Sequence, residues 1–192
     1  MIPGYHIDAN HGHIVQSRAL ERKTPANKAI SYPLLSFQRL ELIKDVCGRP
    51  ATLLDYGSPE FVLYCDTGGI QTTGCRISDA ADPFIAYDVA TLFDVFQLMT
   101  EDEQRDLLGT LVCKHLVLSV PWCHPELGAE WFAAWRHLKR DEHLSHWTSA
   151  SLCSLLRIYN YRPIYVGNPE DAIRKVESEW WPNILTVILK RI

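Results

Sequence analysis

No hydrophobic stretch of this sequence is long enough to cross a membrane. The longest apolar run, from Leu107 to Cys123, is interrupted by Lys114 and His115, whereas a spanning helix needs about 20 predominantly apolar residues. The opening residues, Met1 to His6, also lack the basic and apolar regions of a secretory signal. We therefore expect a protein that is neither embedded in a membrane nor secreted.

Closely spaced cysteine pairs are absent as well. The six cysteines occur singly, without a C-x-x-C motif, and most have apolar neighbours: Cys47, Cys65, Cys75, Cys113, Cys123 and Cys153. This pattern is typical of buried thiols in a reducing compartment and argues against a disulfide framework. We expect a cytoplasmic protein.

Nor is there an excess of basic residues. Lysine and arginine together number 19, against 23 aspartates and glutamates, which gives a formal net charge of -4. A non-specific DNA binder usually carries a net positive field, so nucleic acid is not an expected partner. With 192 residues, 47% of them hydrophobic, and no internal repeat, the composition is that of one folded globular domain.

Residues 1–35 differ from the rest of the chain. They are mainly polar and hold no helical or strand periodicity for long, so we predict an N-terminal arm. At Ser36, a good N-cap, apolar residues begin to recur at helical spacing, and Gly48 ends that helix. We therefore place a single domain at residues 36–192.

Short apolar runs alternate with helical patterns through this domain. Helix starts are marked by Ser58-Pro59 and by a capping box at Thr100–Glu103. The predicted strands cover residues 51–56, 70–77, 89–96, 115–121, 162–166 and 184–189. Strands and helices that alternate in this way predict an α/β fold with an open, mostly parallel sheet.

Five segments, taken in order and spacing, resemble the class I S-adenosylmethionine-dependent methyltransferases. They are Leu53–Gly57, which is similar to that family's strand-one glycine motif, Thr91–Phe96, Leu116–Pro121, Trp131–Leu152 and Asn183–Arg191. The resemblance therefore covers residues 53–191. It implies a Rossmann-like sheet whose last strand is antiparallel and lies beside strand five.

The resemblance also implies where a cofactor would bind. In the family, a glycine-rich loop lets backbone amides approach the methionyl part of S-adenosylmethionine, and an acid after strand two accepts hydrogen bonds from the ribose. Carried onto this sequence, the pattern assigns cofactor binding to Asp55, Gly57, Asp79 and Asp94. It leaves the catalytic residues unknown, because methyl transfer would rest mainly on positioning the acceptor.

Three residues depart from the family pattern at this site. Pro59, which has no N–H, replaces the second glycine, and Phe61 replaces the third with a ring that we expect to fill the ligand's space. Arg76 falls where the ribose acid is expected, and an arginine only donates hydrogen bonds. These changes predict an eroded cofactor site.

The connection between strands two and four is too short for the family's strand three. Only the ten residues from Ser78 to Tyr87 are available, and a parallel crossover alone takes about a dozen. After strand four, Gln97-Leu98-Met99 replaces the Glu-His-Leu that related enzymes often show. We predict a sheet that lacks or shortens strand three.

Two functions follow from the resemblance. The first is a methyltransferase-like protein that binds no cofactor and has a binding, structural or assembly role. The second is an active S-adenosylmethionine-dependent methyltransferase with an altered pocket, whose cofactor Asp55, Gly57 and Asp79 would hold and whose acceptor is unknown. The changes at Pro59 and Phe61 favour the first.

Histidines and one cysteine offer further alternatives. A metal-dependent hydrolase would use the block around His137, His143 and His146, but the spacing matches no known metal motif, and we expect hydrogen-bonding roles and no metal. The pair Cys123-His124 suggests a thiol nucleophile, although neighbours in sequence seldom share a catalytic geometry.

The expected partner is a protein or a second copy of the chain. Trp180 and Trp181 are adjacent and precede the last strand, so they cannot both face one core, and one is left for an interface. The polar arm of residues 1–35 is the second expected contact surface.

Overall fold

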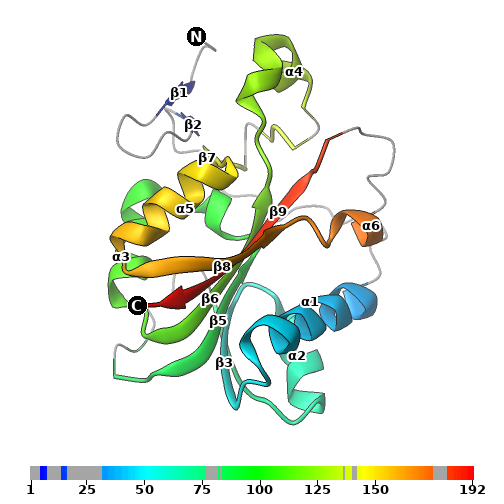
Figure 1. The fold of residues 1–192 in the computed structure, drawn as a ribbon, viewed down its shortest axis with the longest axis vertical. Coiled ribbons are helices and arrows are strands. Elements are labelled where there is room, and N and C mark those ends of the chain that lie inside the picture. The colour runs from blue at the N-terminus through cyan, green and yellow to red at the C-terminus, as the bar shows by residue number, and fades with distance from the viewer. Residues whose placement is uncertain are drawn as a thin grey trace.

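A computed structural model describes residues 5–7, 14–16, 32–76, 82, 84–135, 137–139, 142–174 and 181–192. These residues form an α/β fold in which helices cover both faces of a six-stranded sheet (Figure 1). The strand order is β4-β3-β5-β6-β9-β8. None of the helices described is both long and apolar enough to span a bilayer.

Four neighbouring strands of the sheet are parallel. β3 (Thr52–Tyr56) lies between β4 (Gln71–Cys75) and β5 (Tyr87–Phe93), and β5 pairs with β6 (Cys113–Pro121). Within the described part of the connection from β4 to β5 there is no further strand. Among the described residues the sheet therefore contains no counterpart of the family's strand three, for which the short connection leaves little room.

The other two strands reverse direction. β9 (Ile184–Arg191) is antiparallel to β6 and lies between it and β8 (Tyr161–Gly167), to which it is also antiparallel. The predicted antiparallel last strand beside strand five is therefore confirmed.

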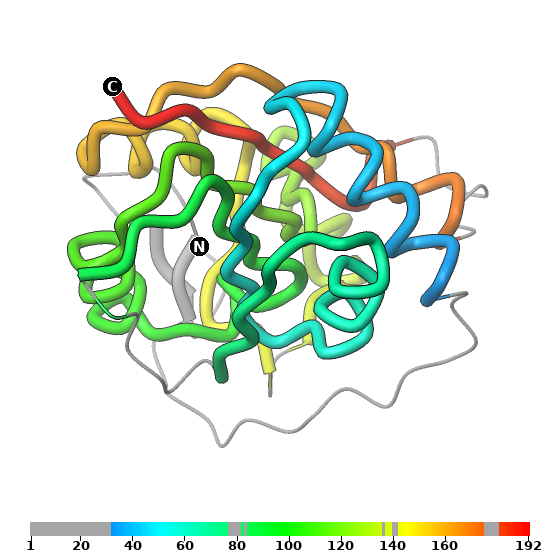
Figure 2. The backbone as a smooth tube through the Cα atoms, turned by 90° about the horizontal axis from the view of Figure 1, so that it is seen from below, coloured from blue at the N-terminus to red at the C-terminus, as the bar shows by residue number. Residues whose placement is uncertain are grey.

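Helices α1 (Tyr32–Cys47) and α2 (Pro59–Thr67) cover one face of the sheet (Figure 2). Side chains alternate along a strand, so Leu53 and Val89 point toward these helices while Leu54 and Ala90 point away. Two separate cores result, one on each side of the sheet.

Helices α3 (Glu101–Thr110) and α5 (Ser149–Ile158) cover the opposite face. Both begin with a capping box, in which Thr100 exchanges hydrogen bonds with Glu103 and Thr148 with Ser151. These reciprocal bonds satisfy the free N–H groups at each helix start, and the predicted box at Thr100 is confirmed.

Several boundaries differ from the predictions. α1 begins at Tyr32 rather than after Ser36, and Ser36 is buried within the helix. The segment after β6 forms a 3-10 turn, η2 (Pro125–Leu127), and a short helix, α4 (Gly128–Ala134). The third predicted strand ends at Phe93 and is followed by the turn η1 (Phe96–Leu98). The described part of the last helix, α6, is Asp171–Arg174.

The described parts of the arm contain two short strands. β1 (Tyr5–Ile7) and β2 (Ile14–Gln16) pair with each other, and β2 pairs with β7 (Ser145–His146), which gives a small three-stranded antiparallel sheet. The sequence did not indicate these strands, because three residues are too few to show an alternating pattern. The arm thus contacts a late segment of its own chain.

Candidate functional site

The loop after β3 reaches the carboxyl edge of the sheet, where β3, β5 and β6 end. Its first glycine, Gly57, has a φ of +84°, and a Cβ there would lie 2.7 Å from Cγ2 of Val95. Only glycine tolerates both constraints. Because Gly57 has no Cβ, the Val95 side chain occupies the space that a Cβ would need.

Asp55 holds this loop from inside. Its side chain is fully buried, its Oδ1 accepts a hydrogen bond from Thr91 Oγ1 at 2.5 Å, and its Oδ2 accepts one from the Ser58 N–H at 2.8 Å. Burial raises the pKa of this carboxyl to about 6, and the two hydrogen bonds oppose that shift. Asp55 therefore fixes the loop and does not face a ligand.

Pro59 and Phe61 belong to the first turn of α2. Pro59 begins the helix, where its missing N–H has no intrahelical partner to lose. Phe61 is 1% exposed and meets Phe93 edge to face, with ring centroids 5.0 Å apart. The ring packs into the core between the helices and the sheet, and its filling of a ligand's space stays a prediction.

Asp94 follows β5 directly and has an unusual backbone. Its φ is 59°, in the left-handed region that non-glycine residues seldom adopt, and its side chain is 39% exposed. Its Oδ2 accepts hydrogen bonds from Arg39 Nη2, at 3.2 Å, and from Arg174 Nη2. Burial opposes ionisation, but the charges of Arg174 and Arg39 lower the pKa of Asp94 to about 2.

Glu170 completes this arrangement, which we call the ion quartet: Arg39, Asp94, Glu170 and Arg174. Glu170 is 1% exposed and accepts hydrogen bonds from Nε and Nη2 of both arginines, at 2.6 to 3.0 Å. Ser119 Oγ donates a further hydrogen bond to it at 2.8 Å. Although burial opposes ionisation, the arginines lower the pKa of Glu170. Two cations and two anions therefore balance one another at this edge.

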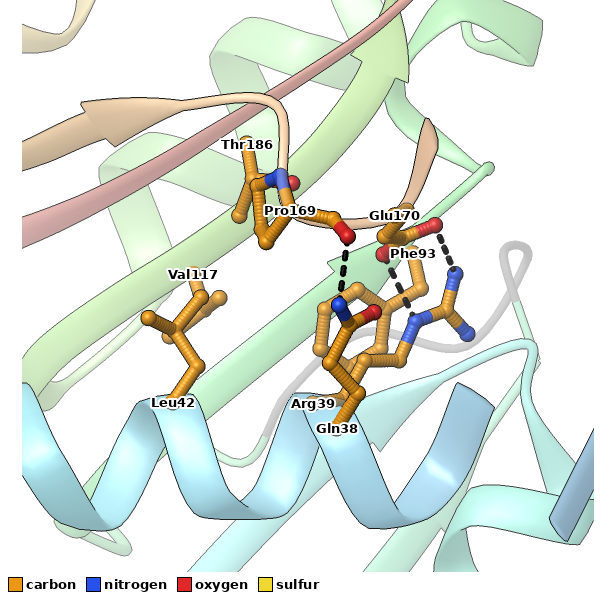
Figure 3. Close-up of a pocket in the computed structure, with 8 residues that line it drawn as sticks. All are labelled: Gln38, Arg39, Leu42, Phe93, Val117, Pro169, Glu170 and Thr186. Atoms are coloured by element: carbon orange, nitrogen blue, oxygen red, sulfur yellow. Dashed lines mark hydrogen bonds and ion pairs between the residues drawn. The ribbon is translucent and has the colours of Figure 1, made fainter. Parts of the chain in front are cut away.

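A small cavity lies beside the quartet (Figure 3). Its volume of about 10 Å³ is at most enough for one water molecule. Arg39 crosses it, with the guanidinium carbon 4.0 Å from the centre of the Phe93 ring, and Gln38 donates a hydrogen bond to the Pro169 carbonyl. Hydrogen bonds from Gln38 and Arg39 thus hold the segment that contains Glu170 against α1, across the strand ends. The cavity is far too small for a nucleoside.

The residues to which the resemblance assigns a cofactor occupy different surroundings. Gly57 and Asp94 both lie at the carboxyl edge and are linked through Val95, the residue after Asp94. Asp55 is turned inward, and Asp79 lies outside the described residues. Arg76 follows β4 and is exposed. Of the assigned residues that the structure describes, Gly57 and Asp94 therefore lie at the open carboxyl edge of the sheet.

These residues do not fit S-adenosylmethionine well. The loop offers no N–H at Pro59, and the space beside Gly57 is occupied by the Val95 side chain. The Arg76 side chain supplies no acceptor for the hydroxyls of a ribose. The arginines near Asp94 are already paired with carboxylates. No cofactor chemistry is derived from this arrangement.

His143, His146 and Cys123 are buried, and His137 is half-buried. His143 is 4% exposed, its Nδ1 donates to the His137 carbonyl at 2.9 Å, and burial lowers its pKa to about 4. Within the described ranges, no three His, Cys, Asp or Glu side chains are grouped as metal ligands. Burial raises the pKa of Cys123 to about 12, which leaves it a poor nucleophile.

Sequence reasoning missed Arg39, Glu170 and Arg174. One signal was present: Arg39 falls on the same helical face as Leu35, Leu40 and Ile43, all of which are buried. A charged residue on an apolar helical face predicts a buried ionic partner. Its partner Glu170 is 131 residues away in sequence, so no local pattern identifies it.

Comparisons with known proteins concern the fold. No protein-family model and no curated protein sequence matches the chain. A 1,6-didemethyltoxoflavin-N1-methyltransferase from Burkholderia thailandensis, solved with 1,6-didemethyltoxoflavin and S-adenosylhomocysteine, superposes with a TM-score of 0.57 at 12% identity, over 97% of this chain and 98% of that one.

Two further structures agree with it. The methyltransferase domain of a bacterial protein, CtHen1, gives a TM-score of 0.55 at 12% identity, over 83% of this chain and 97% of that one. A magnesium protoporphyrin IX methyltransferase from Synechocystis PCC 6803, solved with S-adenosylhomocysteine, gives 0.50 at 11%, over 88% and 90%. From strand order and these superpositions together, the chain has the fold of the class I S-adenosylmethionine-dependent methyltransferases.

Proposed function

We propose that this chain is a methyltransferase-like protein that transfers no methyl group and serves as a binding or assembly component. The observation that carries the proposal is the loop after β3. The Asp55 carboxylate accepts hydrogen bonds from Thr91 and Ser58, and Phe61 belongs to the core. Residues that would serve a cofactor in the family are used here to hold the fold.

The ion quartet supports the same proposal. A general base needs a pKa near the working pH, and the pKa of Asp94 is held at about 2. Glu170 is buried and bound by two arginines and a serine. Neither carboxylate is suited to removing a proton from a methyl acceptor.

The test is calorimetry with S-adenosylmethionine and S-adenosylhomocysteine at high micromolar concentration. We expect no saturable heat from the native chain. Pro59→Gly combined with Arg76→Asp restores a loop N–H and a ribose acceptor and serves as the matched variant. Saturable binding to the native chain, at about one ligand per chain, contradicts the proposal.

An active methyltransferase is the second candidate, and Asp94 favours it. A left-handed, partly exposed acid at the end of a central strand is a strained feature of the kind that clusters at functional sites. Transfer of labelled methyl from S-adenosylmethionine to components of a cell extract, abolished in Asp94→Asn, would establish this candidate. A chain that never transfers label ends it.

For the binding role we propose Trp181 as a contact residue, together with the arm. Trp181 is 47% exposed, and its ring centre is 6.2 Å from that of His124. His124 stacks on Trp122 and meets Trp131 edge to face, so Trp181 is the exposed member of a rigid aromatic cluster. Trp180 lies outside the described residues.

Sedimentation of the full chain tests whether Trp181 joins two copies. We expect a concentration-dependent dimer that Trp181→Ser weakens. Leu63→Ser, which changes another exposed apolar residue, is the control and leaves the equilibrium unchanged. If both variants behave like the native chain, Trp181 is not a self-association contact.

A further inference from the structure

Two cations lie directly opposite each other in the sheet. Arg162 of β8 pairs in register with Lys190 of β9, and Lys190 pairs on its other side with His115 of β6. Residues paired in register point to the same face of a sheet. The three basic side chains therefore form one row across three strands, which we call the basic row.

The arrangement is unfavourable for the fold alone, because like charges directly opposite each other in antiparallel strands repel. Arg162 and Lys190 are both exposed, and among the described residues neither forms an ion pair. Most other described cations have a carboxylate partner: Arg39, Lys44, Arg105, Lys114, Lys139 and Arg174. Arg162 and Lys190 are thus neighbouring cations without a carboxylate partner among the described residues, in a chain whose net charge is -4.

Protection of a sheet edge explains only half of the row. β8 is an edge strand, and a charged residue there discourages unwanted strand pairing. Arg162 fits that use. β9 lies between β6 and β8, so edge protection gives no reason for Lys190.

The nearby acid does not neutralise the row. Asp88 accepts hydrogen bonds from Lys114 Nζ at 2.6 Å and from the N–H groups of Ala51 and Thr52. Burial lowers the pKa of His115, and the Lys190 and Lys114 charges act in the same direction. The Asp88 charge acts on His115 in the opposite direction and offsets part of this positive field, but the ion pair that Asp88 forms is with Lys114 and not with Lys190 or Arg162.

We propose that the basic row, His115, Lys190 and Arg162, is a docking surface for an acidic segment of a partner protein. The inference rests on the proposed binding role and names the chemistry of the partner. An acidic segment laid across the row supplies carboxylates to Arg162 and Lys190, which form no ion pair among the described residues. A nucleic acid duplex is the weaker choice, because it is larger than the row and most of its phosphates would lie against the rest of a chain of net negative charge.

The experiment uses the full chain and a fluorescently labelled hexaglutamate peptide in an anisotropy titration. We expect saturable binding that weakens as salt is added, and a loss of about tenfold or more in Lys190→Gln and in Arg162→Gln. Arg157→Gln is the matched control. It removes the same charge from an exposed, unpaired residue at the end of α5, on the other face of the sheet, and should bind as the native chain does.

Stability gives a second, independent measurement. Because the substitution relieves repulsion, Lys190→Gln should raise the Tm by ~1–3 °C while it weakens peptide binding. A purely structural lysine would lower the Tm or leave it unchanged. Equal peptide affinity in the Lys190→Gln and Arg157→Gln variants overturns the proposal.

Two further arms separate the possible outcomes. Tighter binding of a DNA duplex or of phosphatidylserine vesicles than of hexaglutamate overturns the choice of an acidic protein segment. Binding of S-adenosylmethionine in calorimetry contradicts the proposed function, but it leaves the peptide result standing. The two proposals can therefore fail separately.

Discussion

At the scale of single residues, the loop after β3 depends on two side-chain choices. Gly57 provides a left-handed backbone with no Cβ beside Val95, and Asp55 provides the two acceptors that hold the turn. The motif that resembles a cofactor loop is therefore also a structural requirement of this fold. Its retention does not need a ligand as an explanation.

Gly57→Ala tests how much the close approach contributes. We expect a loss of about 2–4 kcal/mol in the free energy of unfolding, from backbone strain and from overpacking against Val95. Gly48→Ala is the control, because Gly48 has a similar φ of +79° but nothing within 4 Å of an added Cβ. Urea denaturation of both variants measures the difference, and equal losses would show that Val95 is irrelevant.

Asp55→Asn tests the buried carboxyl. Its native pKa of about 6 lies above the ordinary 3.8, so the protonated form is favoured by folding. The associated stability is complete below about pH 4 and is lost as the pH rises through 6. Asparagine keeps an acceptor for Ser58 and carries no charge.

We therefore expect the free energy of unfolding of Asp55→Asn, measured relative to that of the native chain, to be higher at pH 8 than at pH 4 by about 2–3 kcal/mol. Chemical denaturation at both pH values measures it. Thr91→Val removes the hydroxyl that donates to Asp55, and this variant should be less stable than the native chain at pH 8. An Asp55→Asn effect that does not change with pH contradicts the raised pKa.

At the scale of elements, the ion quartet joins α1 to the turn before α6. α1 contributes Arg39, the turn contributes Glu170, and α6 contributes Arg174, while Asp94 comes from the end of β5. Breaking a buried ion pair leaves an uncompensated charge inside the protein. The attachment of α6 and its preceding turn to α1 therefore depends on all four charges of the ion quartet.

Arg39→Gln or Glu170→Gln should each lower the free energy of unfolding by about 3–5 kcal/mol. The double variant should lose less than the sum of the two, because neither charge is then left alone. Lys44→Gln, which removes an exposed partner of Glu41, is the control and should change stability by under ~1 kcal/mol. Additive losses in the double variant would argue against direct pairing.

The elements also show where sequence reasoning succeeds. Strands with continuous apolar runs, and a helix with a capping box such as that at Thr100, are specified by their own segments and are predicted from the sequence. The start of α1 was misplaced because Ser36 is a good cap in isolation, yet tertiary packing buries it in the helix. The quartet was missed because its members lie far apart along the chain, and only the assembled sheet brings them together.

At the scale of the whole molecule, the cysteines report on global opening. Burial raises the pKa of Cys65 to about 12 and of Cys113 to about 11, and all six thiols are free. A thiol reagent should therefore label Cys65 and Cys113 only as fast as the molecule unfolds. Mass spectrometry of labelled peptides measures this, with half-buried Cys153 as the faster control; labelling of Cys65 as fast as Cys153 would indicate local opening instead.

The position of β9 has a consequence for how the protein is made. β9 comes last in chain order, but it is inserted between β6 and β8. Until Ile184–Arg191 has left the ribosome, β6 ends a four-stranded sheet with an apolar open side, and β8 has no strand to pair with. A nascent chain would thus carry an incomplete sheet with an unpaired, aggregation-prone edge until this segment has been translated. We expect binding of a chaperone to be most important during this interval.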